Sequence, residues 1–388
     1  MSCVVGIICE YNPFHKGHKY QIDRIREEMP DATIICIMSG NIVQRGEFAM
    51  LDKYDRARLA LECGANGVFE IPYPYSGSTA EIFANAGVTL ANKLYCDYIC
   101  FGIENESIEN LEKIAFAIDT KEFENAIKKH LSNKENGYIL AKQQALKDLG
   151  FDMPKSANDI LAIEYIRAIR SNNLPLKYIA IKRLGAEYKD TSVCDIMSAS
   201  AIRSFYIEKQ QLISVPNELI NEYNKLVEEK KVLDYSSQER FLHTYVLLNG
   251  DKIKHHFDSN AEIASVAIKC AKNSTDSHEF LSSLSTKSLT SARIKRAIMY
   301  SIFDVNKVDF SPQFTIMLGI DSKGLLLMSK IKKMLEITVV TKHSDIKNAS
   351  EEIRLMAEKQ YHVDSIYYTL LKKQFPASQA YKNKPIIK

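Results

Sequence analysis

The fold is decided by residues 4–18, VVGIICEYNPFHKGH. Residues 4–9 form an apolar run rich in β-branched side chains, a pattern typical of a strand that is buried on both faces. A polar loop follows at residues 10–18, and the apolar spacing over residues 19–28 predicts a helix that ends before Pro30. The stretch therefore predicts a strand, a loop at its carboxyl end and a helix, in that order.

Predicted strands and helices alternate along the first half of the chain. Apolar runs predict further strands at residues 33–38, 67–71, 98–102 and 177–181, with helices between them. This alternation is typical of right-handed βαβ units, so we expect an α/β fold with a doubly wound parallel sheet. Ligands of such sheets bind at the carboxyl ends of the strands. The loop after the first strand is therefore a candidate binding site.

The pattern changes after about residue 205, where we expect the sheet to end. Helical apolar spacing predicts helices at residues 218–230, 239–248, 262–271, 291–303 and 350–360. A chain of 388 residues is long enough for two domains. We therefore predict a nucleotide-binding, catalytic α/β domain over residues 1–205 and a mostly α-helical domain over residues 206–388.

The composition is that of an ordinary globular protein. Hydrophobic residues make up 46% and charged residues 26%, and 51 basic against 48 acidic residues leave a formal charge of +3. This balance does not by itself indicate a nucleic-acid partner, so such an argument must rest on local clusters. The eight cysteines form no CxxC pair, and no signal-peptide pattern or membrane-length apolar run occurs. We therefore expect a cytoplasmic protein with reduced cysteines, no membrane contact and no metal site made by the protein alone.

The loop after the first strand contains His15, Gly17 and His18, a His-x-Gly-His pattern at the start of the first helix. Helix N-termini attract anions, and a glycine lets the backbone come close to a phosphate. Imidazoles can donate hydrogen bonds to phosphate oxygens that gain charge when the α-phosphorus of ATP is attacked. We therefore predict that His15 and His18 are catalytic and stabilise an adenylyl transfer. The alternative, a surface loop without function, is disfavoured by the position directly after the first strand.

A second element lies at Ser198, Ser200 and Arg203, where the hydroxyls can cap a helix and the arginine lies one turn further on. Hydroxyls and an arginine in this arrangement can also bind a leaving pyrophosphate. A plain helix start has the same pattern. The phosphate-binding interpretation therefore depends on the histidine loop.

Together the two elements resemble the HxGH nucleotidyltransferase superfamily, whose members attack the α-phosphate of ATP, usually with Mg²⁺. The N-terminal half is more closely similar to the bacterial tRNA(Met) cytidine acetate ligases. Five ordered blocks carry this resemblance: EYNPFHKGH (10–18), GNIVQRGE (40–47), FGIE (101–104), KSANDIL (155–161) and SASAIR (198–203). Beyond residue 205 the resemblance rests mainly on SARIKR (291–296).

The resemblance implies an ATP-dependent ligase. In that family ATP and acetate form acetyl-adenylate, and the acetyl group passes to N4 of the wobble cytidine of elongator tRNA(Met), without acetyl-coenzyme A. By position, the family's ATP contacts fall on Ile7, Ile8, Cys9, Glu10, Tyr11, Asn12, Pro13, Phe14, His15, Lys16, Gly17, His18, Lys19, Tyr20, Gly102, Asn158 and Arg183. To these we add Ser198, Ser200 and Arg203 from the second element.

Local basic clusters suit an RNA-binding role for the second half of the chain. They lie at residues 252–256, 287–296 and 330–333, and such clusters can bind a phosphate backbone. A solvated helical surface has the same composition, so it is the resemblance that favours RNA. The residues that we predict to contact tRNA are Lys287, Arg293, Lys295 and Arg296.

Two other functions remain open. A small-molecule adenylyltransferase of nucleotide cofactor synthesis would share the histidine loop but would need no basic domain. A non-catalytic relative would bind RNA and would not use ATP. Acetate-dependent release of pyrophosphate separates the ligase from both alternatives, and the sequence implies no protein partner.

Overall fold

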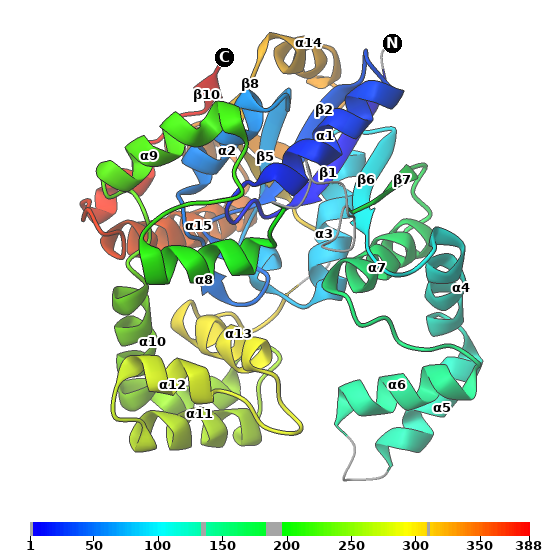
Figure 1. Cartoon of the computed structure of the whole chain (residues 1–388), viewed down its shortest axis with the longest axis vertical. Coiled ribbons are helices and arrows are strands. Elements are labelled where there is room, and N and C mark those ends of the chain that lie inside the picture. The colour runs from blue at the N-terminus through cyan, green and yellow to red at the C-terminus, as the bar shows by residue number, and fades with distance from the viewer. Residues whose placement is uncertain (1–2, 133–136, 184–195, 309–310) are drawn as a thin grey trace.

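The computed structural model describes residues 3–132, 137–183, 196–308 and 311–388. Within these residues an eight-stranded sheet has the order β10-β8-β5-β2-β1-β6-β7, and β9 pairs with β8 (Figure 1). Its strands are β1 (Val4–Cys9), β2 (Thr33–Ser39), β5 (Gly67–Ile71), β6 (Tyr98–Ile103), β7 (Lys177–Lys182), β8 (Phe314–Ile320), β9 (Thr338–Val340) and β10 (Ile386–Ile387). A separate hairpin consists of β3 (Ile42–Val43) and β4 (Glu47–Phe48).

The first strand lies at the centre of the sheet. Every residue of β1 is buried, and the strand pairs in parallel with β2 on one side and β6 on the other. The chain therefore builds the sheet outward from β1 in one direction and then in the opposite direction. This confirms the predicted doubly wound α/β fold, and it leaves a crevice at the carboxyl ends of β1 and β6, where the direction of winding changes.

The expected end of the sheet near residue 205 is wrong. β8 pairs antiparallel with β5, and β9 and β10 pair in parallel with β8. All seven residues of β8 are buried, and its pairing covers the backbone N–H and C=O groups that β5 would otherwise leave open at an edge. The sheet therefore crosses the proposed domain boundary, and the division of roles between residues 1–205 and 206–388 stays a prediction.

Helices cover both faces of the sheet and form most of the remaining chain. The α-helices are α1 (Lys16–Glu28), α2 (Lys53–Glu62), α3 (Ala80–Lys93), α4 (Ile108–Ile118), α5 (Lys121–Leu131), α6 (Tyr138–Asp148), α7 (Ala157–Ser171), α8 (Ala199–Lys209), α9 (Ile220–Glu228), α10 (Tyr235–Asn249), α11 (Ala261–Asn273), α12 (Ser277–Ser283), α13 (Ser291–Ile302), α14 (Ser322–Ile331) and α15 (Glu351–Thr369). Short 3₁₀ helices lie at Tyr75–Gly77, Asn217–Leu219, Gly250–His255, His343–Asn348 and Ala377–Tyr381. The five helices predicted beyond residue 205 are confirmed as α9, α10, α11, α13 and α15.

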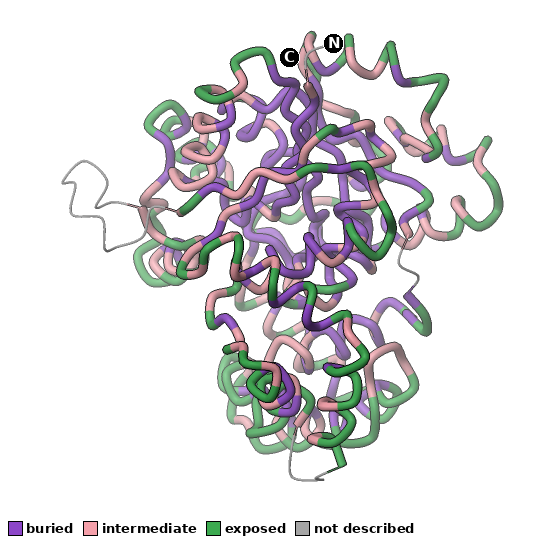
Figure 2. Tube along the Cα trace, turned by 90° about the vertical axis from the view of Figure 1, so that its right-hand side faces the viewer, coloured by how far each residue is buried: buried purple, intermediate pink, exposed green. Residues whose placement is uncertain are grey.

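Two helical groups extend from the sheet on the same side of the molecule. One is the α5–α6 hairpin and the other is the bundle of α10 to α13, and Figure 1 shows them next to each other below the sheet. A β-carbon on Gly137, just before α6, would lie 3.4 Å from the backbone oxygen of Ser288, so the two groups approach each other closely at this point. Figure 2 shows that buried residues concentrate around the sheet, while the lower helices are mostly exposed.

Candidate nucleotide-binding site

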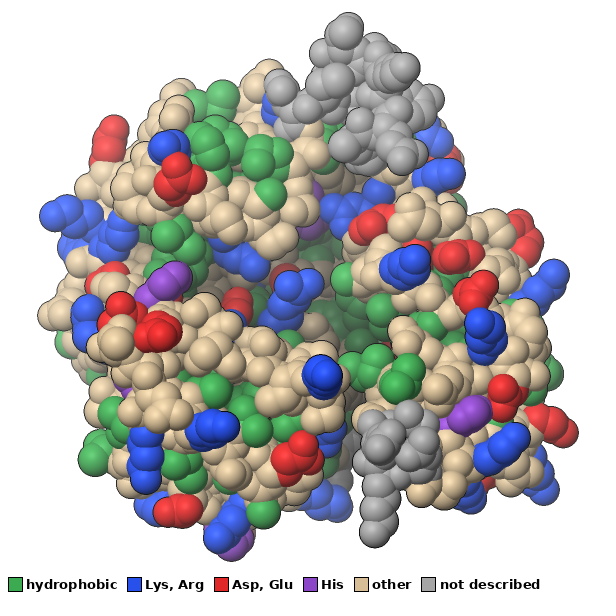
Figure 3. All heavy atoms as spheres, turned by 60° about the horizontal axis from the view of Figure 1, so that its bottom comes forward, with side chains coloured by type: hydrophobic (Ala, Val, Ile, Leu, Met, Phe, Trp, Pro, Cys, Tyr) green, Lys and Arg blue, Asp and Glu red, His purple; other side chains and the backbone are tan. Residues whose placement is uncertain are grey.

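A cavity of about 420 Å³ lies at the carboxyl ends of β1 and β6, where the sheet changes its direction of winding. The histidine loop, the β3–β4 hairpin and the N-terminal ends of α7 and α8 complete its walls. The predicted ATP residues that line it are Ile8, Cys9, Glu10, Tyr11, Asn12, His15, Gly17, His18, Tyr20, Gly102, Asn158, Arg183, Ser198, Ser200 and Arg203. Figure 3 shows Lys and Arg side chains around the hollow in the middle of this face.

Five predicted ATP residues lie outside the cavity wall: Ile7, Pro13, Phe14, Lys16 and Lys19. Ile7 and Phe14 are fully buried in the core, and the backbone oxygen of Phe14 accepts a hydrogen bond from the Tyr223 hydroxyl at 2.5 Å. The ammonium of Lys19 forms an ion pair with Asp23 on α1. Ile7 and Phe14 therefore belong to the core on which the loop packs, and Lys19 forms an ion pair within α1.

The two histidines hold the start of α1 through their Nδ1 atoms. His15 is the N-cap residue, and its Nδ1 accepts a hydrogen bond from the backbone N of Gly17 at 3.0 Å. The Nδ1 of His18 accepts from the backbone N of His15 at 3.2 Å, and the two rings stack with centroids 3.8 Å apart. Because Nδ1 is the acceptor in each ring, a neutral ring carries its hydrogen on Nε2. The helix begins at Lys16, earlier than predicted, because His15 caps it.

Both histidines are neutral at physiological pH. Burial lowers the pKa of His15 to about 3, and the charge of Arg183 adds to this effect. Burial also lowers the pKa of His18 well below its usual value, with further contributions from His15 and Arg183. The rings can therefore donate hydrogen bonds through Nε2. They do not carry the extra proton that a general acid would give up. Burial raises the pKa of the nearby Cys9 thiol, which excludes a thiolate nucleophile at this position.

Glu10 and Arg56 organise the carboxyl ends of β1 and β2. The buried guanidinium of Arg56 donates to the backbone oxygens of Glu10 at 2.5 Å and Gly40 at 2.6 Å, so it ties the two strand ends together. The Glu10 side chain accepts from the backbone N of Gln44 at 2.8 Å. Burial raises the pKa of Glu10, and the Gln44 hydrogen bond and the charge of Arg203 oppose this rise.

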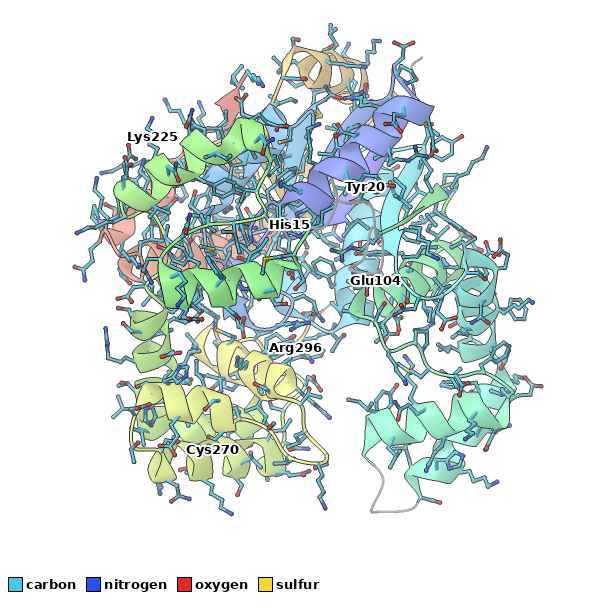
Figure 4. All side chains as sticks on the ribbon, in the orientation of Figure 1. His15, Tyr20, Glu104, Lys225, Cys270 and Arg296 are labelled. Atoms are coloured by element: carbon cyan, nitrogen blue, oxygen red, sulfur yellow. The ribbon has the colours of Figure 1, made fainter. Side chains whose placement is uncertain are left out.

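The opposite wall is built by the end of β6 and the start of α7. Arg183 Nη1 lies 3.4 Å from Glu104 Oε1, and the side-chain amide of Asn158 donates to the same oxygen. The Asp159 carboxylate accepts from the backbone N of Glu104 at 2.7 Å, which fixes α7 to the strand end. A β-carbon on Gly102 would lie 3.0 Å from Arg183 Cγ, so any larger residue at this position would crowd the arginine side chain. Figure 4 shows Glu104 near His15 in the centre of the molecule.

The structure brings the two predicted motifs together. Ser198 caps α8 by accepting from the backbone N of Ala201 at 3.3 Å, and its hydroxyl lies 3.1 Å from that of Ser200. Arg203 Nη1 donates to the backbone oxygen of Asn12 at 2.7 Å, although the two residues lie 191 positions apart. The N-termini of α1 and α8 therefore both open into one cavity, and each can bind a phosphate group.

Comparison with known proteins agrees with this arrangement. Residues 1–383 match the family described as HIGH Nucleotidyl Transferase. The chain belongs to this family. Proteins named tRNA(Met) cytidine acetate ligase from Fusobacterium nucleatum and Caldanaerobacter subterraneus are each 31% identical to it, over 95% and 99% of this chain and 99% of their own length. The crystal structure of Thermotoga maritima TmcAL bound with alpha-thio ATP superimposes with a TM-score of 0.88 at 25% identity and covers 99% of both chains.

Some cavity-lining residues of this HIGH nucleotidyl transferase were not predicted as site residues. They include Gln44, Arg45 and Glu47 on the β3–β4 hairpin, Glu104 at the end of β6, and Tyr165 on α7. The hairpin belongs to one of the blocks that carry the resemblance, so a signal was present. No local pattern indicates, however, that this hairpin folds over the end of the central strand.

The four predicted RNA contacts have different surroundings. Lys287 is exposed, whereas Arg293 pairs with Asp258 at 3.0 Å and Lys295 pairs with Glu47 at 2.6 Å. Arg296 is only 8% exposed, and burial lowers its pKa. The four side chains therefore do not form one open basic face, and their contact with RNA stays a prediction.

The described residues contain no group of three or more His, Cys, Asp and Glu side chains that could hold a metal ion. No helix among them is both long enough and apolar enough to cross a membrane.

Proposed function

We propose that this HIGH nucleotidyl transferase joins acetate to N4 of the wobble cytidine of elongator tRNA(Met) and consumes ATP. In the first step an acetate oxygen attacks the α-phosphorus of ATP, which forms acetyl-adenylate and releases pyrophosphate. In the second step the exocyclic amine of the cytidine attacks the acetyl carbon. The acetyl–phosphate bond breaks, AMP leaves, and the amine loses a proton.

The observation that carries this proposal is the convergence of two neutral histidines and two helix N-termini on one cavity. The Nε2–H groups of His15 and His18 are free of the backbone hydrogen bonds that occupy Nδ1. Such donors stabilise the charge that develops on the α-phosphate oxygens during attack. A relative that covers 99% of the chain carries alpha-thio ATP, which supports the same ligand here.

The remaining residues have roles that follow from their position. Ser198, Ser200 and Arg203, at the start of α8, would bind the leaving pyrophosphate. Asn158 and Arg183, on the opposite wall, would bind the ribose, the base or a phosphate. We propose that Mg²⁺ enters with ATP, held mainly by phosphate oxygens and water.

The second half of the proposal concerns RNA. Two relatives named tRNA(Met) cytidine acetate ligase cover nearly the whole chain, so the likeness includes the helical bundle as well as the sheet. We propose that residues 206–388 contribute most of the tRNA contacts and that residues 1–205 provide most of the ATP chemistry. Because tRNA is modified where it is made and used, we place the protein in the cytoplasm.

The test is to incubate pure protein with ATP, labelled acetate and total tRNA, and to analyse the nucleosides by mass spectrometry. Label in N4-acetylcytidine, together with acetate-dependent release of pyrophosphate, would support the proposal. Pyrophosphate release that ignores acetate would indicate a cofactor synthase. RNA binding without any use of ATP would indicate a non-catalytic relative.

A further inference from the structure

The β3–β4 hairpin forms one wall of the cavity and carries Gln44, Arg45 and Glu47 into it. It is held from both sides. The backbone N of Gln44 donates to Glu10 at the end of β1, and the backbone N of Phe48 donates to Gln238 on α10 at 2.9 Å. The hairpin is therefore a fixed part of the cavity wall.

Helix α13 provides the third support of the hairpin. Lys295 Nζ lies 2.6 Å from Glu47 Oε1, and the two side chains are only 16% and 26% exposed. A β-carbon on Gly46, whose φ is +73°, would lie 2.7 Å from the backbone N of Arg296. The turn of the hairpin thus touches the backbone of α13. An ion pair sheltered in this way is screened less by solvent than an open surface pair.

Arg45 differs from the other arginines of the cavity. Arg183 pairs with Glu104, and Arg203 donates to the backbone oxygen of Asn12. Among the described residues Arg45 has no hydrogen bond or ion pair, and it acts on Glu10 only through its charge. Its planar guanidinium is therefore available to bind a carboxylate through two parallel hydrogen bonds.

The proposed reaction needs such a group. A small carboxylic acid offers a recognition surface of two oxygens and an alkyl group, and it must approach a triphosphate of the same charge. The histidines and the start of α8 are already assigned to the phosphates, so the acid requires a cation of its own. Arg45 lies on the hairpin, which forms a different wall from the histidine loop and the start of α8. It supplies that charge.

We propose that Arg45 binds the carboxylate of the acid substrate and that the Glu47–Lys295 ion pair positions the hairpin that carries it. The proposal rests on the proposed function and assigns its acid-binding subsite. Arg45 would contact the substrate directly. Lys295 is a positioning residue, which acts through Glu47.

The first test compares Arg45→Gln and Arg45→Lys in acetate-dependent pyrophosphate release without RNA. Loss of a charged hydrogen-bonding group should raise the KM for acetate about tenfold or more in Arg45→Gln, with the KM for ATP within about twofold. Arg45→Lys keeps the charge but not the paired donors, so its KM should lie between. The matched control is Arg58→Gln on α2, an arginine that pairs with Asp55 at 3.0 Å and does not line the cavity.

Three results would overturn the assignment of Arg45. They are an unchanged KM for acetate, an equal rise in the KM for ATP, and a change confined to the tRNA-dependent step. A wild-type protein without acetate-dependent pyrophosphate release would instead refute the proposed function. The two failures are therefore distinguishable in one experiment.

The second test reverses the charges of the ion pair. Glu47→Lys and Lys295→Glu should each raise the KM for acetate, and the double variant should restore it because the pair is re-formed with opposite sense. Thermal unfolding of all three variants identifies any loss of folding. If Lys295 acted only on RNA, the single variants would leave acetate use unchanged and the double variant would rescue nothing.

Discussion

At the scale of single residues, each histidine of the HIGH loop uses Nδ1 for the backbone, and Nε2 is the atom that we propose to face the substrate. His15 Nδ1 caps α1 through the backbone N of Gly17, and His18 Nδ1 accepts from the backbone N of His15. An alanine at either position removes both a helix cap and a proposed phosphate donor. Substitutions that remove one function at a time are therefore more informative.

At His18 the two functions can be separated with asparagine and glutamine. The asparagine amide reaches the place of Nδ1 and can keep the cap, whereas the glutamine amide reaches the place of Nε2 and can keep the donor. We expect His18→Asn to slow adenylate formation by about two orders of magnitude or more, and His18→Gln to retain more of the rate. Pyrophosphate release at saturating ATP and acetate measures this. A rate near wild type in His18→Asn would remove the donor from the mechanism.

The charge state of the histidines can be measured in the free protein. The pKa of His15 is about 3 and that of His18 is also lowered by burial, so neither ring should gain a proton as the pH falls from 8 to 5. Exposed His278, whose pKa is raised by Glu239, should gain its proton more readily and serves as the internal control. NMR titration of the ring signals reports each site. Titration of His15 near its usual pKa would mean that the ring is charged during phosphate binding.

At the scale of elements, one buried lysine joins α2, β5 and α15. Lys53 Nζ lies 2.7 Å from Glu70 and 2.6 Å from Asp364, and all three side chains are almost completely buried. Burial raises the pKa of Glu70 to about 8, against the opposing charge of Lys53. Burial therefore favours the neutral form of Glu70, which leaves Lys53 and Asp364 as a balanced pair. A β-carbon on Gly40 would lie 2.0 Å from Glu70 Oε1, so only glycine fits there.

This arrangement predicts a large effect for one substitution and a small effect for another. Lys53→Met leaves the Asp364 carboxylate unpaired in the core and should lower the free energy of unfolding by about 3–5 kcal/mol. Glu70→Gln replaces a neutral acid by a neutral amide and should change it by less than about 1 kcal/mol at pH 6. Denaturant unfolding of both variants measures these differences.

The pH dependence of Glu70→Gln gives an independent check. The folded pKa of Glu70, about 8, lies above its unfolded value of about 4.3. The folded state therefore binds the extra proton between these values, and stability decreases as the pH rises toward 8. Glutamine has no such proton, so the variant should gain stability relative to wild type from pH 5 to pH 8. A constant difference over this range would show that Glu70 is ionised in the folded protein.

At the scale of the whole molecule, the cavity opens on the face toward which the α5–α6 hairpin and the α10–α13 bundle extend (Figures 1 and 3). An RNA that delivers a cytidine to this cavity must therefore approach between or across these helical groups. Lys287, on the loop before α13, is exposed, whereas α14 lies at the opposite end of the molecule from α13 in Figure 1. The basic clusters of the sequence are thus not equivalent.

Salt dependence distinguishes these clusters. If Lys287 contacts a phosphate of the tRNA, Lys287→Ala should weaken binding and reduce the slope of log K against log salt concentration by about 1. Lys333→Ala removes another exposed lysine, just after α14, and should leave the slope unchanged. Gel shifts at several salt concentrations measure both. Equal slopes for Lys287→Ala and wild type would exclude this lysine from the RNA interface.

The sequence by itself determined the buried first strand and the loop that we propose to bind phosphate. An apolar run such as residues 4–9 specifies a buried strand through its own composition, and the polar loop with His15 and His18 follows directly in the chain. The α8 motif was found in the same way, since a helix start has a local pattern. The resemblance alone implied that both elements serve one nucleotide, and the contact of Arg203 with the backbone oxygen of Asn12 comes from the structure.

The tertiary structure alone decided which distant segments complete the sheet and the cavity. The pairing of β8 with β5 and the ion pair of Lys295 with Glu47 each join residues more than 200 positions apart. Nothing in the local composition of either partner specifies the other, because backbone pairing and charge attraction accept many partners of the same kind. The choice among them is made by the packing of the whole chain, which places α13 against Gly46 and pairs a basic residue of the helical half with the hairpin that lines the cavity.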